Sequence, residues 1–216
     1  MEVHWQTNNL DIVNIFPTPI GVSNLGRNFT DSEMNFFNNL EYKPNSGNKT
    51  SVEHFILDMP EMKNIRDFCR SRLNEYFKKI YEPEDSELSI ILTQSWVNYS
   101  EAGMHHHIHS HPNSFLSGVF YIKTNPTDVI NFVRSSSNPG GLANTINYEI
   151  MQKSNDYNCS TYYFNAREGM LLLFPSTLTH LVPTLPENSK PRISLSFNTY
   201  FKGRLGSLER MTALYL

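Results

Sequence analysis

Five of the eight histidines of this 216-residue chain fall within seven consecutive positions, in the stretch GMHHHIHSHPNS. His109 and His111 are separated by one residue, and on a β-strand positions i and i+2 face the same side of the sheet. Two neighbouring imidazoles would supply half of a metal site, and imidazole suits iron, zinc, copper or nickel. Pro112 stops a strand from continuing regularly, so the pair is expected near a strand end. A solvent-exposed histidine-rich loop is the alternative.

A third histidine and an arginine follow later in the chain. His180 stands in GMLLLFPSTLTHLVP, which indicates a buried strand, a turn and then a histidine just before another proline. Twelve residues on, Arg192 begins a predicted strand, with Ser194 on the same face. A guanidinium fork beside a hydroxyl is suited to holding a carboxylate. Taken singly, His180 and Arg192 would be ordinary surface residues, but the set as a whole is specific.

The remaining histidines of the stretch, His105, His106 and His107, precede the pair on an expected approach loop. We interpret them as the polar rim of a cavity. Ligation of a metal by one of them is the alternative.

The first part of the chain indicates helices and extended segments. Pro17 and Pro19 interrupt an extended segment over 15–25, which favours an edge strand or a lead-in. Thr30 and Glu33 form a capping-box pattern that begins a short helix. Residues 42–51 are rich in turn formers and predict a loop. Apolar residues at spacings of three and four predict a helix over 60–81, with its apolar side formed by Met62, Ile65, Cys69, Leu73, Tyr76, Phe77 and Ile80.

After residue 85 the periodicity changes to that of strands. β-branched and aromatic runs are separated by Gly, Pro and Asn, which predicts a β-sandwich or barrel with the helices packed outside. Residues 135–160 are the most polar long insertion and are expected to form a mobile loop or hairpin. The predicted strands cover 88–99, 114–123, 128–134, 145–151, 161–167, 170–175 and 192–201.

Length, charge and cysteine content limit the class of protein to which the chain can belong. The length suits one domain, and the formal net charge of −3 gives no basic excess that would indicate nucleic acid. Two isolated cysteines, Cys69 and Cys159, favour reduced thiols in a cytoplasmic protein, or in the host cytoplasm if the chain is phage-encoded. The N-terminal residues carry no signal-peptide pattern, and no segment has the length of a membrane span.

Three segments together resemble a known family. SWVNYSEAG with HSHPNSFLSGVFYI, EGMLLLFPSTLTHLVP, and RISLSFN are similar to the 2-oxoglutarate–Fe(II) oxygenases of bacteria and tailed phages, a prolyl-hydroxylase-like family. The resemblance spans roughly residues 88–200. It implies a double-stranded β-helix, the cupin-like jelly roll, with a metal at its open end. We therefore expect a single domain over 1–216, with 1–85 as N-terminal support and 86–203 as the core.

The resemblance also implies roles for individual residues. His109 and His180 correspond to metal ligands, and Arg192, helped by Ser194, to the group that binds the C5 carboxylate of 2-oxoglutarate. Asn98 and Tyr121 fall where polar groups line the cosubstrate pocket. A strand-edge amide and a core tyrosine are the alternative readings of those last two.

This sequence departs from the usual pattern at one ligand. Non-haem iron oxygenases of this type carry two histidines and one carboxylate, whereas His111 stands at the carboxylate position. A site of three neutral histidines has one more unit of positive charge, which should favour an anionic cosubstrate. We take His111 as the third ligand. A His111 that only supports the site, with water completing the set, is the alternative, and Glu101 is a further candidate.

The implied activity is hydroxylation of a C–H bond, using Fe(II), 2-oxoglutarate and O₂ and yielding succinate and CO₂, with ascorbate as a possible supporting reductant. The 135–160 loop would close over the substrate. The substrate stays open between a protein or peptide, which analogy with prolyl hydroxylases favours, a nucleobase and a small molecule. Three other readings remain: a non-catalytic metal-binding jelly roll, a three-histidine iron dioxygenase independent of 2-oxoglutarate, and a phage structural protein with structural zinc.

Overall fold

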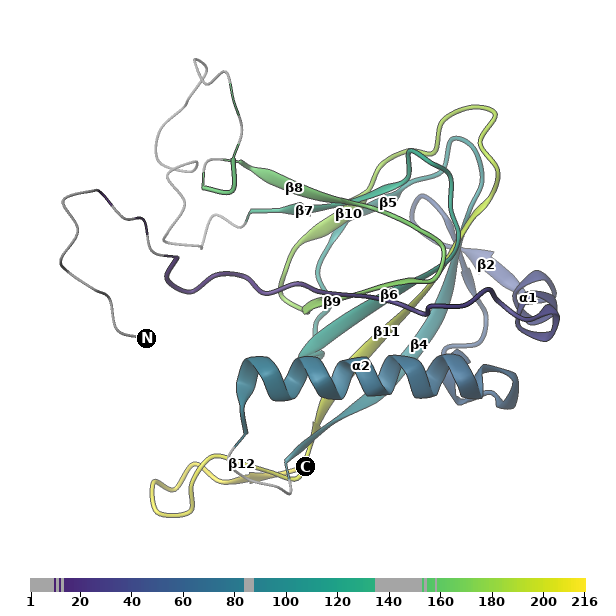
Figure 1. Cartoon of the computed structure of the whole chain (residues 1–216). Coiled ribbons are helices and arrows are strands. Elements are labelled where there is room, and N and C mark those ends of the chain that lie inside the picture. Colours follow the sequence, from purple (N-terminus) through teal and green to yellow (C-terminus); the bar gives the residue numbers. More distant parts are fainter. Residues whose placement is uncertain are drawn as a thin grey trace.

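The computed structural model describes residues 14–83, 88–134, 155–157 and 159–216, together with residues 10, 12 and 153. Within these residues, a seven-stranded and a four-stranded antiparallel sheet form the body of the molecule, and a short ribbon lies at the C-terminal end (Figure 1). In spatial order, the larger sheet consists of β1 (Gly21–Asn24), β9 (Met170–Pro175), β6 (Leu116–Lys123), β11 (Arg192–Lys202), β4 (Ser89–Ser100), β3 (Lys49–Ser51) and β2 (Tyr42–Pro44). The smaller sheet consists of β5 (His106–His109), β10 (His180–Val182), β7 (Val129–Val133) and β8 (Thr161–Asn165), and the ribbon of β12 (Arg204–Leu205) and β13 (Leu214–Tyr215).

Two helices cover one face of the larger sheet. α1 (Asp31–Asn38) begins with the predicted capping box, in which Thr30 and Glu33 satisfy each other's backbone N–H groups. α2 (Lys63–Tyr81) follows two 3₁₀ turns, Ile56–Asp58 and Pro60–Met62. The helix predicted over 60–81 therefore begins as a 3₁₀ turn. Its predicted apolar side is buried except for Ile80, which is 44% exposed.

The central strands of the larger sheet are covered on both faces, which explains their nearly continuous burial. On β9, Leu171 and Leu173 pack in the core beneath the helices, whereas Leu172 and Phe174 pack in a second core toward the smaller sheet. β11 follows the same alternation. Ile193, Leu195 and Phe197 face the helices, which leaves Arg192, Ser194 and Ser196 for the opposite face.

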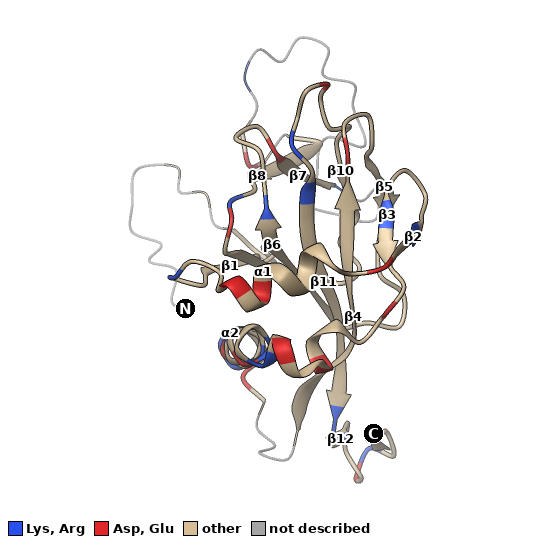
Figure 2. Cartoon of the chain, turned by 90° about the vertical axis from the view of Figure 1, so that its right-hand side faces the viewer, with Lys and Arg blue, Asp and Glu red and all other residues tan. Residues whose placement is uncertain are grey.

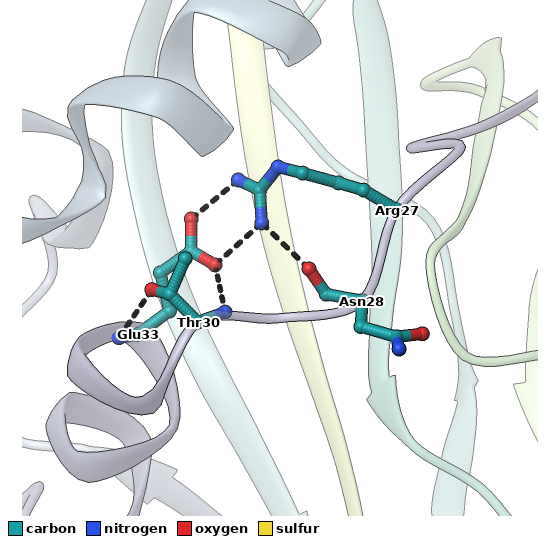
Figure 3. A network of polar contacts seen from close by, with 4 residues as sticks. All are labelled: Arg27, Asn28, Thr30 and Glu33. Atoms are coloured by element: carbon teal, nitrogen blue, oxygen red, sulfur yellow. Dashed lines mark hydrogen bonds and ion pairs between the residues drawn. The ribbon is translucent and has the colours of Figure 1, made fainter.

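Charged residues of both signs are distributed over the helices and connecting segments, whereas the strands are mostly uncharged (Figure 2). Beside α1, Arg27 binds Glu33 through two nitrogens, Nη2 to Oε1 at 2.6 Å and Nη1 to Oε2 at 2.8 Å. Nη1 of Arg27 also donates to the backbone oxygen of Asn28, and Thr30 N–H donates to Oε2 of Glu33 (Figure 3). This network fixes the start of α1.

The structure corrects three details of the sequence interpretation. Residues 42–51, predicted as a loop, contain the β2–β3 hairpin, which adds to the larger sheet beside β4. His180 begins β10, a short strand that was not predicted. His111 lies beyond the end of β5, so it does not share that strand with His109.

The remaining expectations concern the 135–160 insertion, the cysteines and membrane spans. The strand predicted over 145–151 and most of the 135–160 insertion lie outside the described residues. Cys69 and Cys159 are both free thiols, as expected. Among the described helices, none has both the length and the apolar character needed to span a membrane.

Candidate metal centre and cosubstrate pocket

Three histidines meet at one end of the space between the two sheets. His109 at the end of β5 is the register partner of His180 at the start of β10, and His111 follows two residues later. One ring nitrogen from each of the three lies within 4.8 Å of the others. Nε2 of His111 is 3.4 Å from Nε2 of His180. The residues predicted as a ligand set are therefore assembled into one group, although two come from strands and one from the irregular segment after β5.

Backbone carbonyls fix the tautomers of two of these histidines. Nδ1 of His109 lies 2.7 Å from the carbonyl oxygen of His107, and Nδ1 of His180 lies 3.0 Å from that of Leu178. Because a carbonyl oxygen only accepts, each Nδ1 carries the proton and donates it. The Nε2 lone pairs are left free, which is the form in which histidine binds a metal.

An aromatic side chain and a backbone hydrogen bond position the third histidine. The ring of His111 stacks on Trp96, with ring centroids 5.8 Å apart, and its backbone N–H donates to the carbonyl oxygen of Ser176 at 2.9 Å. Glu101, the other candidate ligand, lies instead with its Oε2 at 3.2 Å from Nζ of Lys49. His111 is thus positioned for ligation, and Glu101 is engaged elsewhere.

Burial keeps the three imidazoles neutral. Loss of solvation lowers the pKa of His180 to about 3 and that of His111 to about 4, and it also lowers the pKa of His109. Like charges on neighbouring histidines act in the same direction. Three neutral nitrogen donors converging from one side fit a divalent transition metal such as Fe(II).

Of the three histidines predicted on an approach loop, His106 and His107 lie on strand β5, and His105 directly precedes it. His106 lines the cavity, and its ring stacks on that of His109 with centroids 4.4 Å apart. Nδ1 of His107 lies 3.2 Å from the carbonyl oxygen of Ser46 in the β2–β3 turn, and His105 is exposed. Among the described residues, the group of donor atoms close enough to share one ion contains His109, His111 and His180, and His106 is not part of it. Whether these three residues act as a cavity rim stays a prediction.

A cavity extends from the three histidines along the inner face of the larger sheet. Ser194 of β11 is the register partner of Asn98 on β4 and of Tyr121 on β6, so these side chains form a row across three strands. Arg192 follows at the far end. The structure thus brings all four predicted cosubstrate residues to one cavity, whose other lining residues include Trp96, Val119, Ile130, Phe174, Val182 and Ser196.

The far end of the cavity contains an incompletely paired group of polar side chains. Nη1 of the buried Arg192 lies 3.3 Å from Oδ1 of Asp128, which is also buried. The hydroxyl of Tyr121 is buried without a hydrogen-bond partner. Burial raises the pKa of the Tyr121 phenol, so it remains a hydrogen-bond donor. An acceptor entering the cavity would complete this group, because unpaired buried donors are unfavourable.

Sequence reasoning missed Asp128. It lies in TNPTDV, where an aspartate before a strand indicates a turn. Its partner Arg192 is 64 residues away, so no local pattern points to the pair. Asn98, in contrast, has a structural role in addition to lining the cavity. Its Nδ2 donates to Oγ of Ser196 at 3.0 Å, and its Oδ1 accepts from Asn48 at 3.4 Å.

Comparison with known proteins agrees with this geometry. Residues 94–198 match the family described as "Putative 2OG-Fe(II) oxygenase". This segment contains the three converging histidines and the four predicted cosubstrate residues. A search of the curated proteins gave no match.

Several solved structures share the fold at low sequence identity. HygX from Streptomyces hygroscopicus, with nickel and 2-oxoglutarate bound, is 12% identical with a TM-score of 0.55, covering 84% of this chain and 82% of its own. A 2OG-Fe(II) oxygenase family oxidoreductase from Burkholderia pseudomallei is 12% identical with a TM-score of 0.51, covering 75% and 72%. A Pseudomonas putida prolyl-4-hydroxylase is 11% identical with a TM-score of 0.50, covering 84% and 92%. These likenesses confirm the predicted jelly-roll fold.

Proposed function

We propose that the chain is a member of the 2OG-Fe(II) oxygenase family of oxidoreductases, whose model matches residues 94–198, and that it hydroxylates a C–H bond of a substrate that reaches the histidine end of the cavity. His109, His111 and His180 would hold the Fe(II). Bound there, Fe(II) would supply O₂ activation coupled to oxidative decarboxylation of 2-oxoglutarate to succinate and CO₂. The catalytic unit is a single domain over 1–216, in which 1–85 supports an 86–203 core.

The observation that carries this proposal is the unpartnered hydroxyl of Tyr121 next to Arg192. In the described structure, Asp128 engages only Nη1 of Arg192, so the other guanidinium donors are available. A carboxylate accepts several hydrogen bonds at once and would satisfy both side chains. Arg192 and Tyr121 therefore bind the C5 carboxylate of 2-oxoglutarate, with Ser194 and Asn98 lining the path toward the histidines.

The other residues of the chain orient and protect the reacting groups. The carbonyl groups of His107 and Leu178 hold the rings of His109 and His180 by their Nδ1 protons. Val119, Ile130, Phe174 and Val182 give the cavity an apolar wall that excludes water and strengthens polar contacts inside.

A peptide side chain is the substrate class that we propose, by analogy with the prolyl-4-hydroxylase of the same fold. A small molecule is the second candidate, because a HygX structure of the same fold contains hygromycin B.

The test is succinate formation from 2-oxoglutarate by the full chain with Fe(II), ascorbate and air, without added substrate. We expect slow turnover by the wild type and loss of turnover in His109→Ala, His111→Ala and His180→Ala. His105→Ala is the matched control from the same stretch, because His105 is exposed, and it should retain turnover. Metal binding without 2-oxoglutarate binding would contradict the proposal and favour a metal-binding jelly roll. O₂ uptake with a substrate but without succinate would favour a 2-oxoglutarate-independent dioxygenase.

A further inference from the structure

The two ends of the cavity differ in where the negative charge lies. Glu33 and Asp128 are the acidic residues buried in the described part of the chain, and Glu33 belongs to the α1 cap. The histidine end contains no carboxylate ligand among the described residues. At the arginine end, Asp128 stands directly against Arg192.

Asp128 is held rigidly in this position. Its Oδ2 accepts from the backbone N–H of Asn125 at 2.7 Å and from Nδ2 of Asn125 at 3.3 Å, and its backbone oxygen accepts from Ala166 N–H at 2.8 Å. Asn125 is fixed in turn by two hydrogen bonds with the backbone of Lys190. The carboxylate therefore cannot move away from Arg192 without breaking a connected turn.

Formal charges show how positive charge is divided between the metal end and the arginine end of the cavity. A site with two histidines, one carboxylate ligand and an unpaired arginine has one net positive charge at the metal and one at the arginine. Here three neutral histidines leave both charges of a divalent metal unreduced, and Asp128 cancels the charge of Arg192. The total charge that meets a dianionic cosubstrate is the same, but it lies entirely at the metal end.

We propose that Asp128 is a specificity-determining residue that offsets the charge of Arg192 and compensates, at the far end of the cavity, for the missing carboxylate ligand at the metal. This inference rests on the proposed function. It means that the C5 carboxylate is recognised mainly through hydrogen bonds from Arg192 and Tyr121. Attraction by net charge acts instead on the 2-oxo acid end, beside the histidines. The pocket therefore tolerates a 2-oxo acid without a C5 carboxylate better than a pocket with an unpaired arginine would.

The experiment compares binding of 2-oxoglutarate and 2-oxopentanoate, which lacks the C5 carboxylate, to the Ni(II)-loaded full chain by isothermal titration calorimetry. Asp128→Asn retains the size and an acceptor oxygen but removes the charge. We expect it to raise the preference for 2-oxoglutarate over 2-oxopentanoate roughly tenfold, because one opposing carboxylate charge is gone. Asp67→Asn is the matched control, since Asp67 is an exposed aspartate of α2 paired with Lys63, and its preference should be unchanged.

An unchanged or reduced preference in Asp128→Asn would overturn the inference, because Asp128 would then only orient Arg192. The wild type provides a second test that does not depend on the folding of a variant. If the C5 carboxylate is bound only by hydrogen bonds beside the neutralised Arg192–Asp128 pair, the wild type should prefer 2-oxoglutarate over 2-oxopentanoate by no more than roughly a hundredfold. A much larger preference would contradict the inference. Wild-type protein that binds Ni(II) but neither acid would refute the proposed function as well. Binding of 2-oxoglutarate without the expected change refutes the inference alone.

Discussion

The described part of the chain contains two arginine–carboxylate pairs with a buried acid, and they are built differently. Glu33 receives two nitrogens of Arg27 at 2.6 and 2.8 Å and a third donor from the backbone of Thr30 (Figure 3). Asp128 receives a single nitrogen of Arg192 at 3.3 Å together with two donors of Asn125, and the neighbouring hydroxyl of Tyr121 has no partner. Both carboxylates receive three donors, but only in the first pair does the arginine contribute two of them.

The difference separates a structural contact from a binding site. In the first pair, the side chain of Arg27 is 37% exposed, so its unused donors reach water at no cost. In the second, Arg192 and Tyr121 line a cavity, and the buried hydroxyl of Tyr121 has no hydrogen-bond partner, so an acceptor that enters the cavity would satisfy it. The variants below change a residue of one arginine–carboxylate pair or the neighbouring Tyr121. Each is measured for its effect on stability or on cosubstrate binding.

Arg192→Gln should have the largest effect. The substitution removes a charged donor and leaves Asp128 as an unpaired buried carboxylate, which repels the cosubstrate. We expect the Kd of the Ni(II)-loaded protein for 2-oxoglutarate to rise by roughly a hundredfold or more. Arg27→Gln is the matched control and should bind as the wild type does. Similar binding by both variants in calorimetry would remove the functional distinction between the pairs.

Glu33→Gln should affect stability and not binding. It removes the charge from the bidentate pair and weakens the capping box, so we expect the free energy of unfolding to fall by about 1–2 kcal/mol. Urea unfolding followed by circular dichroism measures this change. A rise in the Kd for 2-oxoglutarate in the folded variant would mean that the α1 cap is coupled to the cavity.

Tyr121→Phe should affect cosubstrate binding and not stability. Loss of the hydroxyl should raise the Kd for 2-oxoglutarate by roughly fivefold to tenfold, the value of one hydrogen bond to a charged acceptor. The metal-free protein should be as stable as the wild type or slightly more so, because the removed hydroxyl has no partner. Marked destabilisation without a change in Kd would indicate a purely structural tyrosine.

The smallest effect concerns pH. The hydrogen bond from Arg27 is the main cause that lowers the pKa of Glu33 in the folded chain. A lowered folded-state pKa gives stability that is present above the unfolded-state value of about 4.3 and is lost as the pH falls through the folded-state value. Wild type should therefore lose its advantage over Glu33→Gln below pH of about 4. A constant difference in Tm between the two proteins across this range would contradict the assignment.

Residue types and spacing, together with the resemblance to a known family, predicted much of the fold and of the candidate site. Strand alternation placed Arg192 and Ser194 on one face, and the structure positions both at the cavity with Tyr121, Asn98 and the three histidines. The capping box at Thr30 and the long helix are confirmed, because both depend on contacts within a few residues. The chemical roles of the site residues stay predictions.

The features that were missed depend on contacts between distant segments. Turn formers over 42–51 predicted a loop, but pairing with β4 makes the segment a hairpin of the larger sheet. His111 reaches the other two histidines from the irregular segment after β5, and residue spacing alone does not predict the path of that segment. Asp128 acquires its importance only through Arg192, on another strand. Burial and pairing across the sheet, rather than local preference, determine each of these.

The most direct test of the account is a titration of 2-oxoglutarate into the full chain, with and without Ni(II), for the wild type and His180→Ala. We predict binding by the wild type that requires the metal, and loss of that binding in His180→Ala. Circular dichroism of the two metal-free proteins checks that the variant remains folded. Metal-independent binding of equal strength in both proteins would contradict the claim that the three histidines and Arg192 form the two ends of one cosubstrate site.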